Sequence, residues 1–70
     1  MTKWPSVKAR ELLAALQNIG WQIKRVAGSH KTLVRDGYAN YVFAFHDNEE
    51  IGPRMLARVA KKTGLSLEDL

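Results

Sequence analysis

The side chains best suited to chemistry are the two histidines, His30 and His46. An unperturbed imidazole titrates near neutral pH, so a histidine can take up or release a proton under physiological conditions. His30 follows Gly28 and Ser29, and a glycine lets the backbone turn sharply and approach a ligand closely. His46 follows an apolar run and by itself is most simply a surface or capping residue. The residues make His30 the first candidate, although a plain turn histidine is an equally good interpretation.

Positive charge surrounds His30 in the sequence. Residues 24–35 contain no acid and hold four cations, which are Lys24, Arg25, Lys31 and Arg35. The whole chain has 11 Lys and Arg against 7 Asp and Glu, a formal net charge of +4. Such a basic footprint suits a polyphosphate partner, although a net charge of +4 is also compatible with an ordinary soluble surface.

Cleavage of RNA is one reaction that a histidine among cations can perform. A base takes the proton of the ribose 2′-hydroxyl while cations stabilise the charged phosphorane, and neither step needs a metal. In this interpretation His30 is the base or acid, and Lys24, Lys31 and Arg35 position phosphates. Gly28 admits the RNA backbone, and Ser29 orients the imidazole, donates to a phosphate or is only a turn residue. His46 is the candidate for a second acid or base.

We expect neither a metal nor another cofactor. The acids Asp47, Glu49 and Glu50 lie near His46, but their spacing matches no familiar set of metal ligands. They are more simply a solvated loop. No glycine-rich nucleotide-binding motif is present.

Length and composition restrict the class of protein. Seventy residues allow one domain, which we place at residues 1–70. There is no cysteine, which excludes disulfides and thiolate metal sites. No apolar run approaches the roughly 20 residues that a membrane span needs, and the first residues do not resemble a signal peptide. We therefore expect a cytoplasmic protein without a membrane partner.

The apolar pattern predicts two helices that flank three strands. Helical spacing of apolar residues favours a helix over 7–18, with Ser6 as N-cap and Gly20 as C-terminal cap. Pro53 suits the first position of a second helix that Gly64 ends, and Ser66 suits the cap of a last turn over 67–70. The apolar face of the second helix would hold Met55, Leu56, Val59, Ala60 and Thr63, opposite Arg54, Arg58, Lys61 and Lys62.

Strand-forming residues cover 21–26, 31–35 and 41–45, with a turn signal at Asp36-Gly37 and a polar loop over 46–52. The short connections predict an antiparallel meander. The fold class is therefore α+β in the order α-β-β-β-α, with both helices on one face of a three-stranded antiparallel sheet. The other face stays open to solvent or to a partner. A hairpin turn near 36–40 would bring the two histidine-bearing strand ends together, but the sequence does not fix the register.

The chain resembles the HicA family of bacterial toxins, small messenger-RNA interferases of toxin–antitoxin pairs. The resemblance covers roughly residues 6–70 and rests on a set of short motifs in order. The motifs are Glu11-Leu12-Leu13, Gly20-Trp21, Gly28-Ser29-His30, Phe45-His46, Ile51-Gly52-Pro53, Leu56-Ala57-Arg58 and the run from Lys61 to Ser66. Two departures stand out: Lys31 occupies a position where many relatives carry a further histidine, and the turn over 36–40 lacks a proline that is common there.

The resemblance implies a fold like that of double-stranded-RNA-binding domains. It also implies that His30 is the catalytic residue, that the substrate is messenger RNA and that an antitoxin of the HicB family covers the site. The leading hypothesis is thus a type II toxin that cleaves RNA without metal. Two alternatives remain, a non-catalytic RNA-binding module of the same fold and a pure protein-interaction domain. The RNA-binding module is disfavoured because double-stranded-RNA binders carry their lysine cluster at the start of the last helix, whereas Lys61 and Lys62 come at its end.

Overall fold

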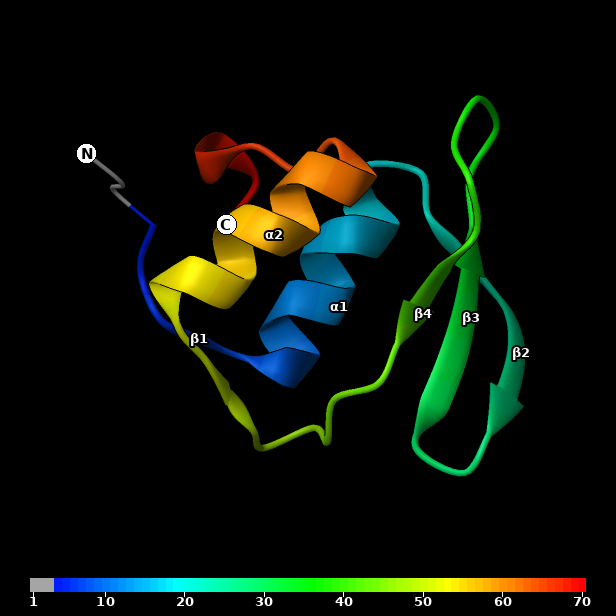
Figure 1. Ribbon diagram of the computed structural model, residues 1–70, viewed down its shortest axis with the longest axis horizontal. Helices are drawn as coiled ribbons and strands as arrows, with labels where there is room; N and C mark the ends of the chain where they lie inside the picture. The colour runs from blue at the N-terminus through cyan, green and yellow to red at the C-terminus, as the bar shows by residue number, and fades with distance from the viewer. Residues whose placement is uncertain (1–3) are drawn as a thin grey trace.

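Two helices and five strands make up the part of the chain that the computed structural model describes, residues 4–70 (Figure 1). A short 3-10 turn, Leu67–Asp69, follows the second helix. In chain order the helices and strands are β1 (Val7–Lys8), α1 (Ala9–Asn18), β2 (Gln22–Ala27), β3 (His30–Val34), β4 (Tyr41–Phe43), β5 (Glu50–Ile51) and α2 (Pro53–Thr63).

The three longer strands form the expected antiparallel meander in the order β2-β3-β4. Lys31 is paired with Phe43, and Ala27 is paired with His30 across a two-residue turn. Lys24 is an extra residue in β2, because Ile23 is paired with Leu33 while Arg25 is paired with Thr32. This bulge interrupts the alternation of side chains along β2.

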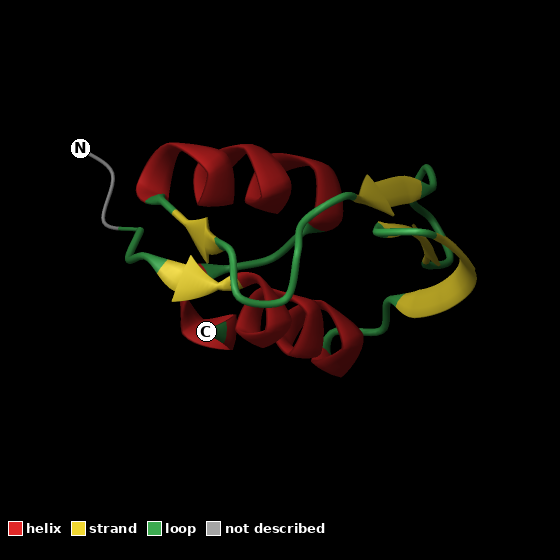
Figure 2. Ribbon diagram, turned by 90° about the horizontal axis from the view of Figure 1, so that it is seen from below, coloured by secondary structure: helices red, strands yellow, loops and turns green. Residues whose placement is uncertain are grey.

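Both helices lie on the same face of this sheet, as the sequence predicts (Figure 2). The buried apolar side chains come from both layers, so one core joins the helices to the sheet. The fully buried ones include Leu12 and Leu16 of α1, Leu56 and Val59 of α2, and Trp21, Leu33 and Phe43 of the sheet side. Trp4 is half-buried and packs against this core.

The first helix begins later than the sequence predicts. Its N-cap is Lys8 rather than Ser6, and the backbone of Lys8 is extended, with φ −72° and ψ 147°. The reason is a strand pair that the sequence analysis missed. Val7 is paired with Ile51 and Lys8 with Glu50, so β1 and β5 form a second, two-stranded antiparallel sheet. Because residues 7 and 8 are held in this ladder, the helix cannot include them.

The third strand of the meander is also shorter than the predicted 41–45. It ends at Phe43, and residues 44–49 lead away toward the N-terminal end of α1. Phe45 nevertheless stays close to the sheet, since its ring packs edge-on against Phe43 with 5.1 Å between centroids. Within the predicted loop 46–52, Glu50 and Ile51 form β5.

The second helix has the predicted ends. Pro53 is its first residue, and Gly64 ends it in the left-handed conformation, with φ 77°. Leu56, Val59 and Thr63 are buried, whereas Met55 is 38% exposed and therefore does not belong to the core as predicted. Trp21 donates a buried hydrogen bond of 3.0 Å from its indole Nε1 to the carbonyl oxygen of Thr63. This bond ties the start of β2 to the last turn of α2.

Neither helix of the described residues is long and apolar enough to span a bilayer.

Candidate functional site

The tip of the β2–β3 hairpin carries His30. The connection is the two-residue turn Gly28-Ser29, and Gly28 has a φ of 63°, a conformation that favours glycine. A glycine with positive φ at the first turn position is typical of a type II′ hairpin. His30 is the first residue of β3, and its side chain is exposed. The local sequence thus fixes a tight turn and places an accessible imidazole directly after it.

Strand alternation decides which face of the sheet His30 occupies. Leu33 is fully buried under the helices, so Lys31 shares the helix-facing side. His30 and Thr32 therefore point to the open face. Val42, which is paired with Thr32, lies on the same open face and is 52% exposed.

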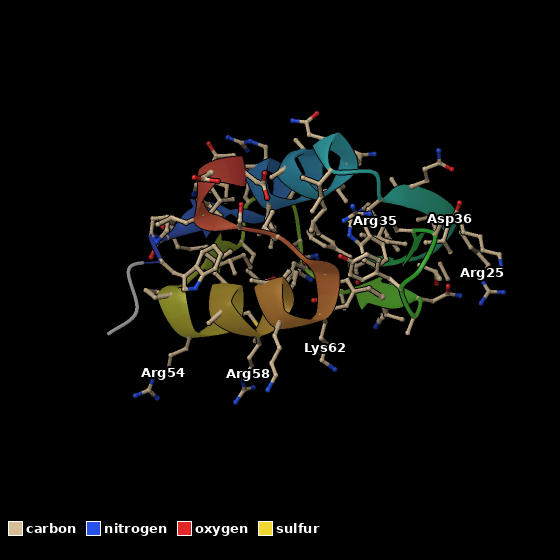
Figure 3. The ribbon with its side chains drawn as sticks, turned by 90° about the horizontal axis from the view of Figure 1, so that it is seen from above. Arg25, Arg35, Asp36, Arg54, Arg58 and Lys62 are labelled. Atoms are coloured by element: carbon tan, nitrogen blue, oxygen red, sulfur yellow. The ribbon has the colours of Figure 1, made fainter. Side chains whose placement is uncertain are left out.

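Arg25 is the cation that shares this open face with His30. It is paired with Thr32 and is separated along β2 from Ala27, the partner of His30, by one residue. Arg25 is exposed, and Figure 3 shows it projecting from the sheet end of the molecule. Its charge is visible in the sequence, but it is not among the predicted site residues. Regular alternation from Ala27 puts it on this face, because Ala27 is paired with His30 across a two-residue turn whose exact length the sequence does not fix.

Three of the predicted site residues meet on the other side of the hairpin tip. A hollow of about 310 Å³ is lined by Ser29, Lys31, Phe45, His46, Asp47 and Asn48. The ammonium of Lys31 lies 6.0 Å from the centroid of the Phe43 ring, at the outer limit for a cation–π contact. Ser29, Lys31 and His46 are therefore neighbours, as the hairpin argument predicts, whereas His30 does not line this hollow.

The loop that carries His46 is held by the start of α1. The carbonyl oxygens of Asp47 and Glu49 accept hydrogen bonds from the backbone N–H groups of Arg10, at 3.1 Å, and Ala9, at 2.8 Å. These are among the N–H groups that a helix cannot satisfy by itself. The Arg10 guanidinium also donates to the Asn48 side-chain oxygen. The backbone N–H of His46 donates to a carboxylate oxygen of Glu49 at 3.1 Å. The acidic loop therefore has a structural role.

Arg35 and Lys24 lie apart from the hollow. The Arg35 guanidinium carbon is 4.7 Å from the centroid of the Tyr38 ring, and a side chain at Gly20 would press on Arg35. Arg35 thus packs between α1 and the β3–β4 turn, which gives it a structural role beside any contact with phosphate. Lys24 is exposed at the bulge of the outer strand β2. The predicted phosphate-binding residues are therefore distributed over both faces of the hairpin.

Within residues 4–70, no cluster of three or more His, Cys, Asp or Glu side chains has an arrangement that could hold a metal ion. One tyrosine near the hairpin is perturbed: burial raises the pKa of the Tyr41 phenol above its ordinary value of 10.0. Tyr41 is therefore a neutral phenol at physiological pH.

Comparison with known proteins adds an independent finding. A family profile described as the HicA toxin of bacterial toxin–antitoxin systems matches residues 9–65. The chain belongs to the HicA toxin family. The match includes both histidines and the whole of both helices, and membership makes the chain the toxin of a toxin–antitoxin system. No curated protein and no solved structure matches the chain.

Proposed function

We propose that this HicA family member is an endoribonuclease that cleaves messenger RNA without a metal ion. In this proposal His30 is the catalytic residue, and the protein acts in the cytoplasm as the toxin of a type II pair whose antitoxin is of the HicB class. One observation carries the proposal above all. In a chain of this family, an exposed imidazole stands at the tip of a tight hairpin, with Arg25 on its own face and Lys31 next to it in the chain.

The proposed reaction is an internal transfer of the phosphate. The 2′-oxygen of the ribose attacks the adjacent phosphorus while His30 takes the 2′-hydroxyl proton. The bond from phosphorus to the 5′-oxygen of the next nucleotide then breaks, and that oxygen gains a proton from an acid. The products are a 2′,3′-cyclic phosphate and a free 5′-hydroxyl. Arg25 is placed to stabilise the negative charge that develops on the phosphate oxygens.

His46 remains our candidate for the acid that protonates the leaving oxygen. It lies with Lys31 and Ser29 around the hollow beside the hairpin tip, whereas His30 points to the open face. An RNA strand that crosses the tip would contact both sides of it. In this arrangement Lys31 and Ser29 contact the phosphate on one side of the tip. Lys24 and Arg35 contact phosphates further along the RNA strand, and Gly28 leaves room for the RNA backbone.

The decisive experiment compares His30→Ala with Thr32→Ala, a variant on the same open face two residues away. Each purified chain is incubated with a labelled single-stranded transcript in the presence of a chelator. We expect His30→Ala to lower the cleavage rate by about 10²–10⁴, the usual effect of losing a general acid or base. Thr32→Ala should cleave like the unmodified chain. His46→Ala, measured in parallel, should show a loss of similar size if it is the acid.

Circular dichroism must show the same spectrum for all variants, because a folding defect would also abolish activity. Full cleavage by a folded His30→Ala chain would overturn the catalytic assignment. Loss of cleavage by the unmodified chain in chelator, with recovery on adding Mg²⁺, would contradict the metal-independent reaction.

A second candidate function is a non-catalytic RNA-binding module. The observation that favours it is that, within residues 4–70, no side-chain hydrogen bond holds the His30 imidazole in one orientation. A catalytic base is usually oriented by a partner group. RNA binding by the unmodified chain without any cleavage would support this second function and exclude the first.

A further inference from the structure

Four cations form a basic face on α2, away from the hairpin tip. The basic face consists of Arg54, Arg58, Lys61 and Lys62, all of which are exposed. Figure 3 shows Arg54, Arg58 and Lys62 projecting from the same side of the helix. At about 1.5 Å of rise per residue, Arg54 and Lys62 lie about 12 Å apart along the helix axis. The basic face is thus a row of charge rather than a single point.

The four cations of this row form no salt bridge within the described part of the chain. The helix α2 contains no acid. The salt bridge found among residues 4–70 joins Lys8 to Glu50 and involves none of the four. Lys61 and Lys62 suit the C-terminal turn, where the helix dipole favours positive charge. Arg54 lies in the first turn, where the same dipole disfavours it, so helix stability does not explain Arg54.

The surface beside the row is better suited to a nucleic acid than to a protein. A hollow of about 690 Å³ is lined by Gly52, Pro53, Arg54, Met55 and Arg58. Met55 is the only large apolar side chain of α2 that is exposed. Lysine is depleted at protein interfaces, where Arg and Met are enriched, whereas RNA phosphates pair with both kinds of cation and unpaired bases stack on apolar groups and on guanidinium planes.

We propose that the basic face of α2 binds the phosphate backbone of the same RNA strand on which the hairpin acts. The geometry points to a second contact region, with the hollow at Met55 receiving an unpaired base. This inference rests on the proposed function, because it assumes that the substrate is single-stranded RNA. Figure 1 shows the start of α2 at the opposite end of the molecule from the hairpin tip. The longest dimension is 34 Å, which about 10 nucleotides span at the duplex spacing of about 3.4 Å each and fewer span when the strand is extended.

The test measures the salt dependence of RNA binding for Arg54→Gln/Arg58→Gln. The probes are 2′-O-methyl oligonucleotides of 4 and 16 nucleotides, which cannot be cleaved through the 2′-oxygen and so make binding independent of catalysis. Each phosphate contact contributes about 0.7 to the slope of log affinity against log salt for a single strand. We therefore expect the slope for the 16-nucleotide probe to fall by about 1.4, and its gain in affinity over the 4-nucleotide probe, which cannot reach both regions at once, to shrink.

The matched control is Ala14→Glu/Gln17→Glu, which lowers the net charge by the same two units at exposed positions of α1. Its slope should stay close to that of the unmodified chain. If the arginine pair disturbs folding, Lys61→Gln/Lys62→Gln tests the other end of the row with the same expectation.

An unchanged slope in a folded variant would overturn the inference, as would an equal fall in the control. If the arginine variant binds RNA normally but loses its antitoxin, the basic face belongs to the protein interface instead. A chain that shows no salt-dependent RNA binding at all would overturn the proposed function together with this inference. That outcome is recognised in the unmodified protein before any variant is made.

Discussion

Two glycines with the same backbone conformation offer a sharp test of how the sheet is attached to α2. Gly64 has a φ of 77° and Gly37 a φ of 85°, so alanine at either position carries the strain of the left-handed region. That strain is about 1–2 kcal/mol, offset by about 0.4–1 kcal/mol because alanine restricts the unfolded chain. A Cβ at Gly37 would meet nothing within 4 Å. Gly37→Ala should therefore cost about 1 kcal/mol of unfolding free energy.

Gly64→Ala should cost more, because its Cβ would overlap the Tyr38 hydroxyl and lie 3.1 Å from the Tyr38 Cζ. The Tyr38 ring is 40% exposed, but moving it would disturb its contacts with Trp21 and Arg35. Its centroid is 5.5 Å from that of Trp21, and the Arg35 guanidinium lies over it. Overpacking of this kind adds about 1–3 kcal/mol, which gives a total of about 2–4 kcal/mol. That total approaches the roughly 3–5 kcal/mol that a chain of this size has available.

Urea unfolding followed by circular dichroism measures both variants. With a slope near 1 kcal/mol per molar urea, the midpoint should fall by about 1 M for Gly37→Ala and by about 2–4 M for Gly64→Ala. If Gly64→Ala is too unstable for a baseline, adding Tyr38→Phe removes the closest atom and should restore part of the loss. Equal midpoints for the two alanine variants would refute the argument, since they would show that Tyr38 does not press on α2.

Three further substitutions test the packing around Tyr38 and the charge of the hairpin. Trp21→Phe should lower the unfolding free energy by about 1–3 kcal/mol, because it leaves the buried Thr63 carbonyl oxygen without its donor. Each kcal/mol should lower Tm by about 4–8 °C. A fall in Tm of less than about 4 °C would mean that water replaces the indole as the donor. Arg35→Gln should lower the unfolding free energy by about 0.5–1 kcal/mol through loss of its contact with Tyr38. Lys24→Gln should leave the unfolding free energy unchanged. If Arg35 and Lys24 each hold a phosphate, each of the two substitutions should reduce the slope of log RNA affinity against log salt by about 0.7. A lower slope for Arg35→Gln without any change in stability would contradict the structural part of its role.

The features that the sequence predicts correctly are those set by local chemistry. Pro53 and Gly64 have properties that suit only the ends of a helix, and Gly28 suits a tight hairpin turn. The apolar spacing of Leu12 and Leu16 identifies the buried side of α1 in the same way. Each of these positions can be interpreted from its own neighbours in the chain.

The features that were missed depend on contacts between distant residues. The pair of β1 and β5 joins Val7 to Ile51, and two-residue strands leave no period in the sequence to detect. Its effect is still local and visible, because it delays the start of α1 and fixes the loop that carries His46. The sequence predicts that the strand ends carrying His30 and His46 lie together, but it could not say that His30 faces away from the hollow that His46 lines.

The register of the β2–β3 hairpin shows why the side chains around His30 could not be chosen from the sequence. Ala27 is paired with His30 across the two-residue turn, and regular alternation from Ala27 places Arg25 on the same open face. The extra residue at Lys24 lies beyond Arg25 and lets Ile23 pair with the buried Leu33 under the helices. The length of the turn therefore decides whether the nearest cation can reach a phosphate held at the imidazole. The chemistry of the hairpin depends on its register as much as on its composition, because the same four cations in another register would present a different set of charges to the RNA.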